Sequence, residues 1–254
     1  MSNSKEHVEL IPMQPSISEN IIPLLLSNAV RVWSAYLITA IPLYFLFYIW
    51  RPSSLSRSRL RPVQAPQRPL KEAFLSLANM TLLAIPMALA AVYGPDPASN
   101  ALSPWIDTTG WVYSTFAVVL VFLIVDAEFF WVHWAFHRFH SKAHAVHHQF
   151  TDPTPFAGWS FHLWESLAYT LPYFPIVLFL PLPPACGFAI LYGTVIWNAY
   201  LHLGYDPLPE SARRHFLGRW FHTARTHCGH HHNPRYTFSL YFTFWDKWMG
   251  TEAP

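Results

Sequence analysis

The sequence has few charged residues and few cysteines, and each shortage excludes a class of protein. Only 12% of the 254 residues are charged, while 52% are hydrophobic. A soluble domain usually carries about 25% charged residues, so this composition indicates membrane spans rather than one large soluble core. The two cysteines, Cys186 and Cys228, have no CxxC spacing, which excludes a disulfide framework and a zinc ribbon. The net charge of +2 is too small to indicate a nucleic-acid partner.

Several recognisable signatures are also absent from the sequence. The HExxH motif of zinc hydrolases does not occur, and neither does a Cys₄ iron–sulfur pattern or a fused haem domain. The start of the chain is polar and contains Glu6, Glu9 and Glu19, which does not fit a cleavable signal peptide. We therefore expect residues 1–25 to form a flexible tail.

Long uncharged stretches predict an all-α integral membrane protein. A helix needs about 20 mostly apolar residues to cross a bilayer, and Val32–Trp50, Ala73–Pro95 and Thr108–Val125 meet this need. A fourth stretch, Ser166–Tyr205, is interrupted by prolines at Leu180–Ala185, which end helices. Its two arms form either a hairpin of two spans or a re-entrant pair, and the hairpin is favoured. We expect about four transmembrane helices, or five if both arms cross, and a cytoplasmic helical cap.

Positive charge predicts how these spans are oriented. Arg51–Lys71 is rich in cations, whereas Pro95–Gly110 contains no lysine or arginine. Because short cytoplasmic loops carry the excess of lysine and arginine, Arg51–Lys71 should lie in the cytoplasm. The spans then deliver His133 and His202 to that same face. We expect a multi-pass protein of the endoplasmic reticulum if eukaryotic, or of the inner membrane if bacterial.

Histidine is unusually abundant and clustered. The chain has 15 histidines against 14 acidic residues. Positions i, i+3 and i+4 share one face of a helix, so each cluster can aim its imidazoles at one point. Neutral imidazole suits iron, copper, zinc and nickel. The clusters are an HxxxH pair (His133, His137), an HxxHH triplet (His144, His147, His148) and a second HxxHH triplet (His227, His230, His231).

The first two clusters are too far apart to act together on one straight helix. Residues 133–148 would span roughly 22 Å as a helix, whereas paired metal ions lie about 3.5–4 Å apart. We therefore expect a bend near Phe139–Ser141, with the pair ending the third span and the triplet on a new helix. An interfacial belt, a surface cluster and a single zinc site are the alternatives. A two-metal site fits the number of histidines best, because a zinc site takes four ligands.

Segments beyond the histidine clusters carry a family resemblance. The stretches VHHQFTDPTPFAGWSFHLWE, HLGYDPLP and FTFWDKWMGT, taken with the three clusters, cover roughly Asp126 to Thr251. They resemble the fatty acid hydroxylase/sterol desaturase superfamily of membrane di-iron oxygenases. The resemblance implies a membrane segment with a basic linker over residues 26–110 and a di-iron catalytic domain over residues 111–254.

The resemblance also implies an activity and a ligand set. Members use two irons, O₂ and two electrons to hydroxylate or desaturate an unactivated C–H position of a lipid, of the sterol or fatty-acyl type. No catalytic residue beyond the metal ligands is implied. His140 is extra and either supports a ligand or replaces one, and the extra His232 leaves the register of the third cluster open by one residue. The implied ligands are His133, His137, His144, His147, His148, His202, His227, His230 and His231.

The sequence leaves the roles of several polar residues near the clusters undecided. Asp126 either supports the site or caps the third span, and His162 with Glu165 either supports the site or forms a local pair. Ligating histidines normally donate their second N–H to a carboxylate or a carbonyl, so a supporting role is physically reasonable for these acids. Asp246 is expected to be structural, and His222 is expected to lie off the face of the third cluster.

Two further expectations concern partners and the competing class of protein. Because the sequence contains no electron-transfer domain, electrons must come from a separate donor, either a cytochrome b5-type protein or a ferredoxin with its reductase. The alternative to an oxygenase is a metal-binding membrane protein, such as a transporter or a sensor. That class would need a polar path through the spans, and Val32–Trp50 and Ala73–Pro95 contain no charge.

Overall fold

The computed structural model describes residues 17–60, 68–93 and 103–253. Within these ranges the chain is helical, and β-structure is limited to two isolated bridges. The elements are α1 (Ile17–Tyr44), the π-helix η1 (Phe45–Trp50), α2 (Ser53–Ser56), α3 (Pro69–Met80), η2 (Thr81–Leu83), α4 (Ala84–Tyr93), α5 (Ser103–Phe139), α6 (Ser141–His148), η3 (Ala157–Trp159), α7 (Leu163–Thr170), α8 (Tyr173–Phe179), α9 (Pro184–Leu201), α10 (Glu210–Arg214), η4 (Gly218–Trp220), α11 (Ala224–His232) and α12 (Phe244–Met249).

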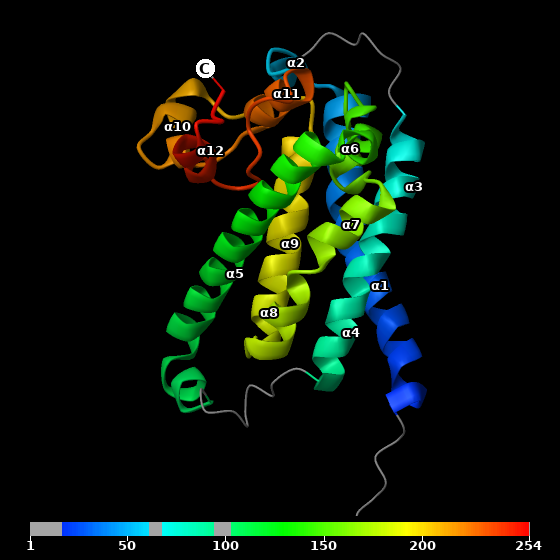
Figure 1. The fold of residues 1–254 in the computed structure, drawn as a ribbon. Coiled ribbons are helices and arrows are strands. Elements are labelled where there is room, and N and C mark those ends of the chain that lie inside the picture. Colours follow the sequence, from blue (N-terminus) through cyan, green and yellow to red (C-terminus); the bar gives the residue numbers. More distant parts are fainter. Residues whose placement is uncertain (1–16, 61–67, 94–102, 254) are drawn as a thin grey trace, which may run out of the picture.

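The helices form an elongated bundle with a cap at one end. Helix α1, the α3–α4 pair, α5 and α9 run along the long axis, and α8 lies beside the lower half of α9 (Figure 1). Helix α1 packs against α4 and α9, and α5 packs against α9. The short helices α2, α6, α10, α11 and α12 gather at the end where α1 and α5 finish, and we call this end the helical cap (Figure 1).

Three helical stretches in the described ranges are long and apolar enough to cross a membrane. They are Ile21–Trp50, Pro69–Tyr93 and Gly110–Phe139, and each overlaps one of the predicted spans. All three are longer than expected and include charged residues: Arg31 in the first, Lys71 with Glu72 in the second, and Asp126, Glu128 and Arg138 in the third. The chain is therefore a membrane protein by composition. Of the expected tail at residues 1–25, residues 1–16 lie outside the described ranges, and residues 17–25 belong to α1.

The fourth apolar stretch is an asymmetric hairpin. The predicted proline break is confirmed, since α8 ends at Phe179 and α9 begins at Pro184. The first arm is divided again, into α7 with 8 residues and α8 with 7 residues, both too short to span alone. The second arm, α9, has 18 residues and returns to the helical cap (Figure 1). Its last residue directly precedes His202.

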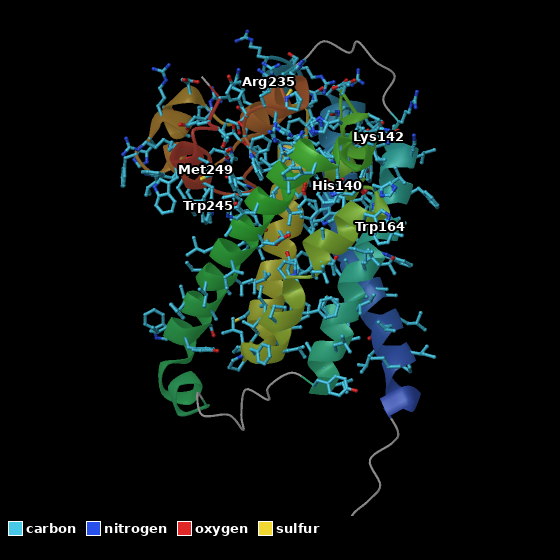
Figure 2. All side chains as sticks on the ribbon, in the orientation of Figure 1. His140, Lys142, Trp164, Arg235, Trp245 and Met249 are labelled. Atoms are coloured by element: carbon cyan, nitrogen blue, oxygen red, sulfur yellow. The ribbon has the colours of Figure 1, made fainter. Side chains whose placement is uncertain are left out.

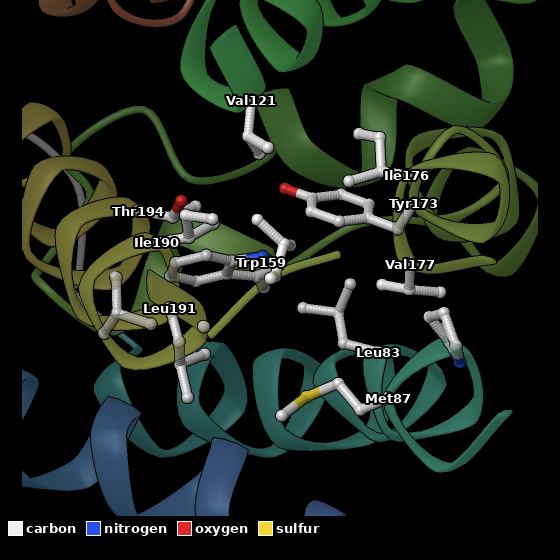
Figure 3. Close-up of a pocket in the computed structure, with 14 residues that line it drawn as sticks. Leu83, Met87, Val121, Trp159, Tyr173, Ile176, Val177, Ile190, Leu191 and Thr194 are labelled. Atoms are coloured by element: carbon white, nitrogen blue, oxygen red, sulfur yellow. The ribbon is translucent and has the colours of Figure 1, made fainter. Parts of the chain in front are cut away.

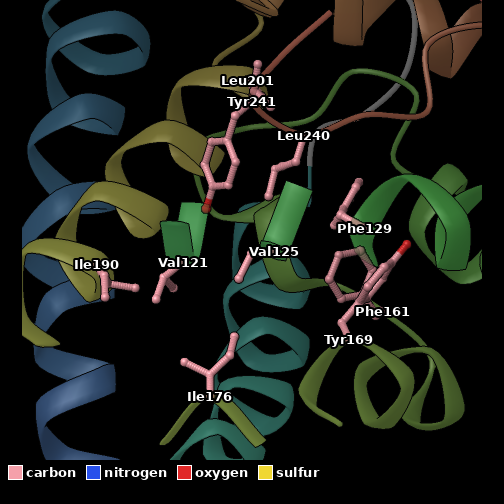
Figure 4. Close-up of a cluster of buried hydrophobic side chains, with 10 residues drawn as sticks. All are labelled: Val121, Val125, Phe129, Phe161, Tyr169, Ile176, Ile190, Leu201, Leu240 and Tyr241. Atoms are coloured by element: carbon pink, nitrogen blue, oxygen red, sulfur yellow. The ribbon is translucent and has the colours of Figure 1, made fainter. Parts of the chain in front are cut away.

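The core of the bundle joins segments that are far apart in the sequence. Figure 4 shows Val121 and Val125 of α5 beside Ile190 of α9, with Leu240 and Tyr241 at the cap side. Within a bilayer, close packing and buried hydrogen bonds hold helices together, because lipid tails are as apolar as leucine.

Buried hydrogen bonds fix the loop that follows α6 against the first two spans. The Asn79 side chain donates to the carbonyls of Trp159 and Phe161, at 2.9 and 2.8 Å. The Tyr36 hydroxyl donates to the Phe156 carbonyl at 2.8 Å. The loop is thereby held between the spans and α7, and its position determines where α7 meets the histidines.

Candidate metal centre

Helix α5 carries the first pair of histidines beyond its apolar segment. His133 and His137 are one turn apart on the same face, and their ring centroids are 4.9 Å apart. The His133 ring is buried, and its Nδ1 donates to the Phe238 carbonyl at 2.9 Å. With Nδ1 protonated, the lone pair of His133 lies on Nε2, which points toward the other histidines.

The predicted bend between the first two clusters is confirmed. Helix α5 ends at Phe139, and His140 adopts φ −131° and ψ 38°, outside the helical region. A straight helix would separate residues 133 and 144 by about 16 Å. Because α6 folds back, the Nε2 atoms of His133 and His144 lie only 3.1 Å apart. The His144 Nδ1 donates to the Glu165 carboxylate on α7 at 2.5 Å.

Helix α11 supplies the third cluster. Its N-terminus is fixed by a capping box, in which the side chains of Thr223 and Thr226 each bond to the backbone of the other. His230 donates from Nδ1 to the Tyr236 carbonyl at 2.7 Å. Its Nε2 lies 3.1 Å from that of His137 and 3.2 Å from that of His148.

The histidines assemble into two adjacent groups, within each of which the potential ligand atoms all lie within 4.8 Å of one another. The ring centroids of His148 and His231, one from each group, are 4.6 Å apart. All nine predicted ligands belong to one group or the other. The five-histidine group contains His133, His137, His144, His148 and His230, and the four-histidine group contains His147, His202, His227 and His231.

The division of each triplet between the two groups corrects our expectation that a triplet aims at one point. On a helix, residue i+4 is about 40° from residue i, whereas residue i+3 is about 60° away in the opposite sense. The i and i+4 residues of α6, His144 and His148, therefore share the five-histidine group, and His147 points to the other. Helix α11 repeats this pattern with the groups exchanged, because His227 and His231 share the four-histidine group and His230 does not.

His202 completes the four-histidine group at the end of α9. Its Nδ1 donates to the Asn198 carbonyl at 2.9 Å, one turn back in the helix. Its Nε2 lies 3.2 Å from that of His147 and 2.9 Å from that of His227.

The donor set fits metal ions. A metal–imidazole bond of about 2.0–2.1 Å places neighbouring ligand nitrogens about 2.9–3.4 Å apart at ordinary coordination angles. The closest Nε2–Nε2 distances in the two groups are 2.9–3.2 Å. Burial, and then the neighbouring imidazoles, lowers the pKa of His227 and of His231 well below the usual value. Both are thus neutral at pH 7, which is the form that binds metals.

The other histidines of the described ranges lie outside the two groups. His140 and His232 are exposed, so neither replaces a member of a cluster, and Figure 2 shows His140 near Lys142 at the corner between α5 and α6. His222 is buried and lies 3.1 Å from Asp246, off the cluster as expected. His162 is the N-cap of α7 and accepts from the Trp164 amide at 3.3 Å, so it does not pair with Glu165.

Two buried aspartates hold the segment that supports His133. The Asp126 carboxylate accepts from the amides of residues 240–242, and it is therefore a structural anchor rather than a helix cap. Asp246 accepts from the amides of Phe238 and Ser239. Burial alone would raise the pKa of Asp246, but its bonds to His222, Ser239 and Phe238 lower that pKa to about 2. The predicted structural role of Asp246 is thus confirmed.

Some supporting groups could not be recognised in the sequence. The carbonyls of Tyr236 and Phe238 hold ligand candidates, but every residue type has a carbonyl and nothing marks these two. Glu165 was one of two open possibilities, and only the fold brings it to His144.

Comparison with known proteins agrees with this geometry. A model of the fatty acid hydroxylase family matches residues 118–251, which is more than half of the chain. The Delta(7)-sterol 5(6)-desaturase ERG3B of Gibberella zeae is 24% identical over 184 residues, covering 72% of this chain and 54% of that protein. Lathosterol oxidase of Mus musculus is 28% identical over 144 residues, covering 56% and 46%. The chain thus spans about half the length of these two relatives.

A third relative aligns over nearly the whole chain. The Delta(7)-sterol 5(6)-desaturase erg3B of Aspergillus fumigatus is 24% identical over 264 aligned positions, covering 98% of this chain and 74% of that protein. No solved structure gives a significant match. The family match contains every histidine of the two groups. The chain therefore belongs to the fatty acid hydroxylase family.

Proposed function

We propose that this protein is a membrane-bound di-iron oxygenase that hydroxylates or desaturates an unactivated C–H position of a lipid. The observation that carries the proposal is the pair of adjacent all-histidine groups at one end of a bundle of apolar helices. The nine histidines are proposed as the ligands, with one iron in each group. Residues 111–254 are proposed as the catalytic domain, carried by the membrane helices and linker of residues 26–110.

Iron is proposed because the chemistry needs a metal that changes oxidation state. Zinc has no redox chemistry, which leaves iron and copper among the common imidazole-bound candidates, and membership of the family favours iron. When bound, the two irons would supply the O₂-dependent oxidation of the C–H bond. Hydroxylation combines R–H, O₂, two electrons and two protons to give R–OH and water. Desaturation uses the same inputs, removes two hydrogens from the lipid and releases two waters.

The chain's own residues would orient the ligands and keep water away from them. The bond from Glu165 fixes both the ring plane and the tautomer of His144, as carboxylates do for metal-bound histidines. Aromatic rings close the membrane side, where Phe129 lies 5.2 Å from the His133 ring and Phe161 lies 4.9 Å from the His147 ring. A dry, fixed ligand set is what controlled oxidation of a hydrocarbon requires.

A lipid substrate of the sterol type is favoured by the relatives. Two of them are named Delta(7)-sterol 5(6)-desaturases and one is named lathosterol oxidase. A fatty-acyl substrate is the competing possibility within the same chemistry. The apolar helices support access from the bilayer rather than from water.

The helical cap is proposed to face the cytoplasm and to receive electrons there. Arg138, Lys142 and Arg235 are exposed on it, and Figure 2 shows Lys142 and Arg235 at its outer side. Such a face suits an acidic donor, for which we propose a separate cytochrome b5-type protein or a ferredoxin with its reductase. The membrane would be the endoplasmic reticulum in a eukaryote or the inner membrane in a bacterium.

Metal analysis and lipid profiling together test the proposal. The purified protein is expected to contain two irons per chain, and membranes that contain it are expected to accumulate an oxidised lipid in an O₂-dependent way. One zinc or no metal, with an unchanged lipid profile, would instead favour a transporter or a sensor. The double substitution His133→Ala with His227→Ala, which removes one ligand from each group, is the inactive control.

A further inference from the structure

Two neighbouring cavities lie on the membrane side of the metal centre. The first, which we call the polar chamber, is lined by Val125, Glu128, Phe129, Phe161, Ser166 and Asn198, among others. The second, the apolar chamber, is lined by residues that include Met87, Val121, Ile176, Val177, Ile190 and Leu191 (Figure 3). Leu83, Trp159, Tyr173 and Thr194 line both chambers, so the two are adjacent.

The polar chamber lies next to the histidines, on the side toward the membrane helices. Its residues Phe129 and Phe161 contact the rings of His133 and His147, which belong to different groups. Figure 4 shows Phe129 and Phe161 beside Tyr169, another lining residue. The chamber is therefore next to both metal groups on the bilayer side, with Phe129 and Phe161 at the boundary.

Four polar side chains that line this chamber have an atom without a hydrogen-bond partner. Within the described residues, Glu128 Oε1, Ser166 Oγ, Tyr169 Oη and Asn198 Oδ1 are buried and unpaired. Leaving a buried polar atom unpaired is destabilising, so such atoms usually indicate a missing ligand or water. Four unpaired atoms around one cavity indicate a place for a polar group of a ligand.

The apolar chamber suits the hydrocarbon part of such a ligand. Its walls are almost entirely aliphatic and aromatic side chains, which suit a hydrocarbon body. A lipid that fills both chambers must therefore place its polar end near the histidines and its hydrocarbon end away from them. Among the described residues, the acid Glu128 is the only charged residue that lines the polar chamber, and with Ser166 and Asn198 it suits a hydroxyl rather than a phosphate.

We infer that the polar chamber binds the hydroxyl group of a lipid alcohol, so that the substrate enters with its polar end first. Glu128 precedes His133 by five residues, or about 7.5 Å along α5, and Asn198 precedes His202 by one turn. The oxidised carbon should therefore lie within about six bonds of the hydroxyl. The statement about the oxidised carbon rests on the proposed function, whereas the orientation of the bound lipid does not.

Photo-crosslinking with two cholestanol probes tests the orientation. One probe carries a diazirine on its ring system near the hydroxyl, and the other carries it at the end of the side chain. Both are added to the full-length, iron-loaded protein in nanodiscs, and the labelled residues are mapped by mass spectrometry. We expect the first probe to label Phe129 or Phe161 and the second to label Ile176, Val177 or Leu191. A reversed pattern, one pattern for both probes, or labelling of bilayer-facing residues alone would overturn the inference.

Substitutions at the polar chamber test the role of the hydroxyl. Unlabelled cholestanol should compete with the ring-labelled probe about tenfold better than its 3-methyl ether, because the ether cannot donate a hydrogen bond. In the double variant Glu128→Leu with Ser166→Ala, the alcohol and the ether should compete almost equally well. Glu128→Gln, which still accepts a hydrogen bond, should keep the preference for the alcohol within about threefold of the original.

Two controls keep the result interpretable. Ile196→Leu, at an exposed position of α9 outside both chambers, should leave the preference unchanged. Unchanged iron content shows that each variant is folded. If the double variant does not fold, Ser166→Ala alone replaces it. A partial loss of the preference for the alcohol in that variant would also support the inference. An unchanged preference in the folded polar-chamber variants would overturn the inference. Because labelling needs no turnover, an inactive protein that labels as expected would contradict the proposed oxygenase function and leave the lipid orientation intact.

Discussion

The two histidine groups differ in how firmly their rings are held. In the five-histidine group, the Nδ1 atoms of His133, His144 and His230 donate to a carbonyl or to Glu165. In the four-histidine group only His202 has such a bond, while the Nδ1 atoms of His147 and His231 are buried without a partner in the described chain. Rings with such partners are fixed before a metal arrives.

The groups also differ in burial, and here the four-histidine group is the better protected from solvent. All members of the four-histidine group are buried, whereas His137 and His148 of the five-histidine group are half-buried. One group is thus rigid and more open, and the other is dry and less supported. We therefore expect the two metals to be inequivalent, with different affinities and different sensitivity to the surrounding protein.

Removing one ligand from each group should have the largest effect. We expect His133→Ala and His227→Ala each to reduce the iron content from two per chain toward one and to lower activity by at least about 100-fold, more than loss of a supporting residue. Iron is counted by elemental analysis. The exposed His215 provides the control, and His215→Ala should retain both irons. A full iron complement in either ligand variant would contradict the assignment of that group.

Removing Glu165 should affect only one group. We expect Glu165→Ala to weaken iron binding in the five-histidine group by about 10–100-fold, because the His144 ring loses its partner. Glu165→Gln should weaken it less, since its amide oxygen still accepts from Nδ1. Anaerobic titration of the metal-free protein with Fe²⁺ resolves the two classes of site. Equal weakening of both classes would show that the groups are not independent.

Asp126 should matter for stability more than for either metal directly. Asp126→Ala leaves the amides of Leu240, Tyr241 and Phe242 without their acceptor, and we expect the free energy of unfolding to fall by about 3 kcal/mol. Unfolding in detergent measures this loss. Asp126→Asn keeps one acceptor oxygen and should be milder. A variant as stable as the original chain would mean that these three bonds contribute little.

The metal-free protein should lose stability in mildly acidic solution. Burial is the main reason that the pKa of His148 and of His202 is lowered, in each case to about 4. In the unfolded chain both titrate near 6.5, so the unfolded state binds more protons between about pH 6.5 and 4. Stability is therefore full above about pH 6.5 and falls toward pH 4, by up to about 1.4 kcal/mol per pH unit for each histidine.

Unfolding of the metal-free protein at several pH values measures this slope. His148→Asn and His202→Asn should each remove a similar part of it, one from each group. A stability that does not change between pH 7 and 4 would contradict neutral, buried imidazoles in the metal-free state.

The extra histidines should have the smallest effect. His140 and His232 are exposed and belong to neither group, so His140→Ala and His232→Ala should change stability by no more than about 0.5 kcal/mol. Both variants should retain two irons. Loss of an iron from either variant would mean that His140 or His232 is a metal ligand in place of a histidine assigned to the two groups.

Much of the site could be predicted from the sequence because histidine spacing carries strong information. The bend after Phe139 followed from helix length alone, since one straight helix keeps His133 and His144 too far apart. The membrane spans followed from hydropathy in the same way. Spacing identified the eight histidines of the three clusters, whereas only the family resemblance pointed to His202. The role of all nine as ligands is a proposal.

The parts that could not be predicted depend on tertiary contacts. The division of each triplet between two groups depends on where α6 and α11 face each other, and spacing alone permits one shared target. The bond from Asp126 to the amides of residues 240–242 joins positions more than a hundred residues apart. The second break in the hairpin, between α7 and α8, follows a single Leu171–Pro172 step that the pattern of apolar residues conceals.

Anomalous diffraction at the iron absorption edge tests the central claim most directly. Crystals of the iron-loaded protein should show two peaks of anomalous density, one within reach of His133, His144 and His230 and the other within reach of His202 and His227. One peak alone, or peaks away from both groups, would contradict a di-iron centre built from these histidines.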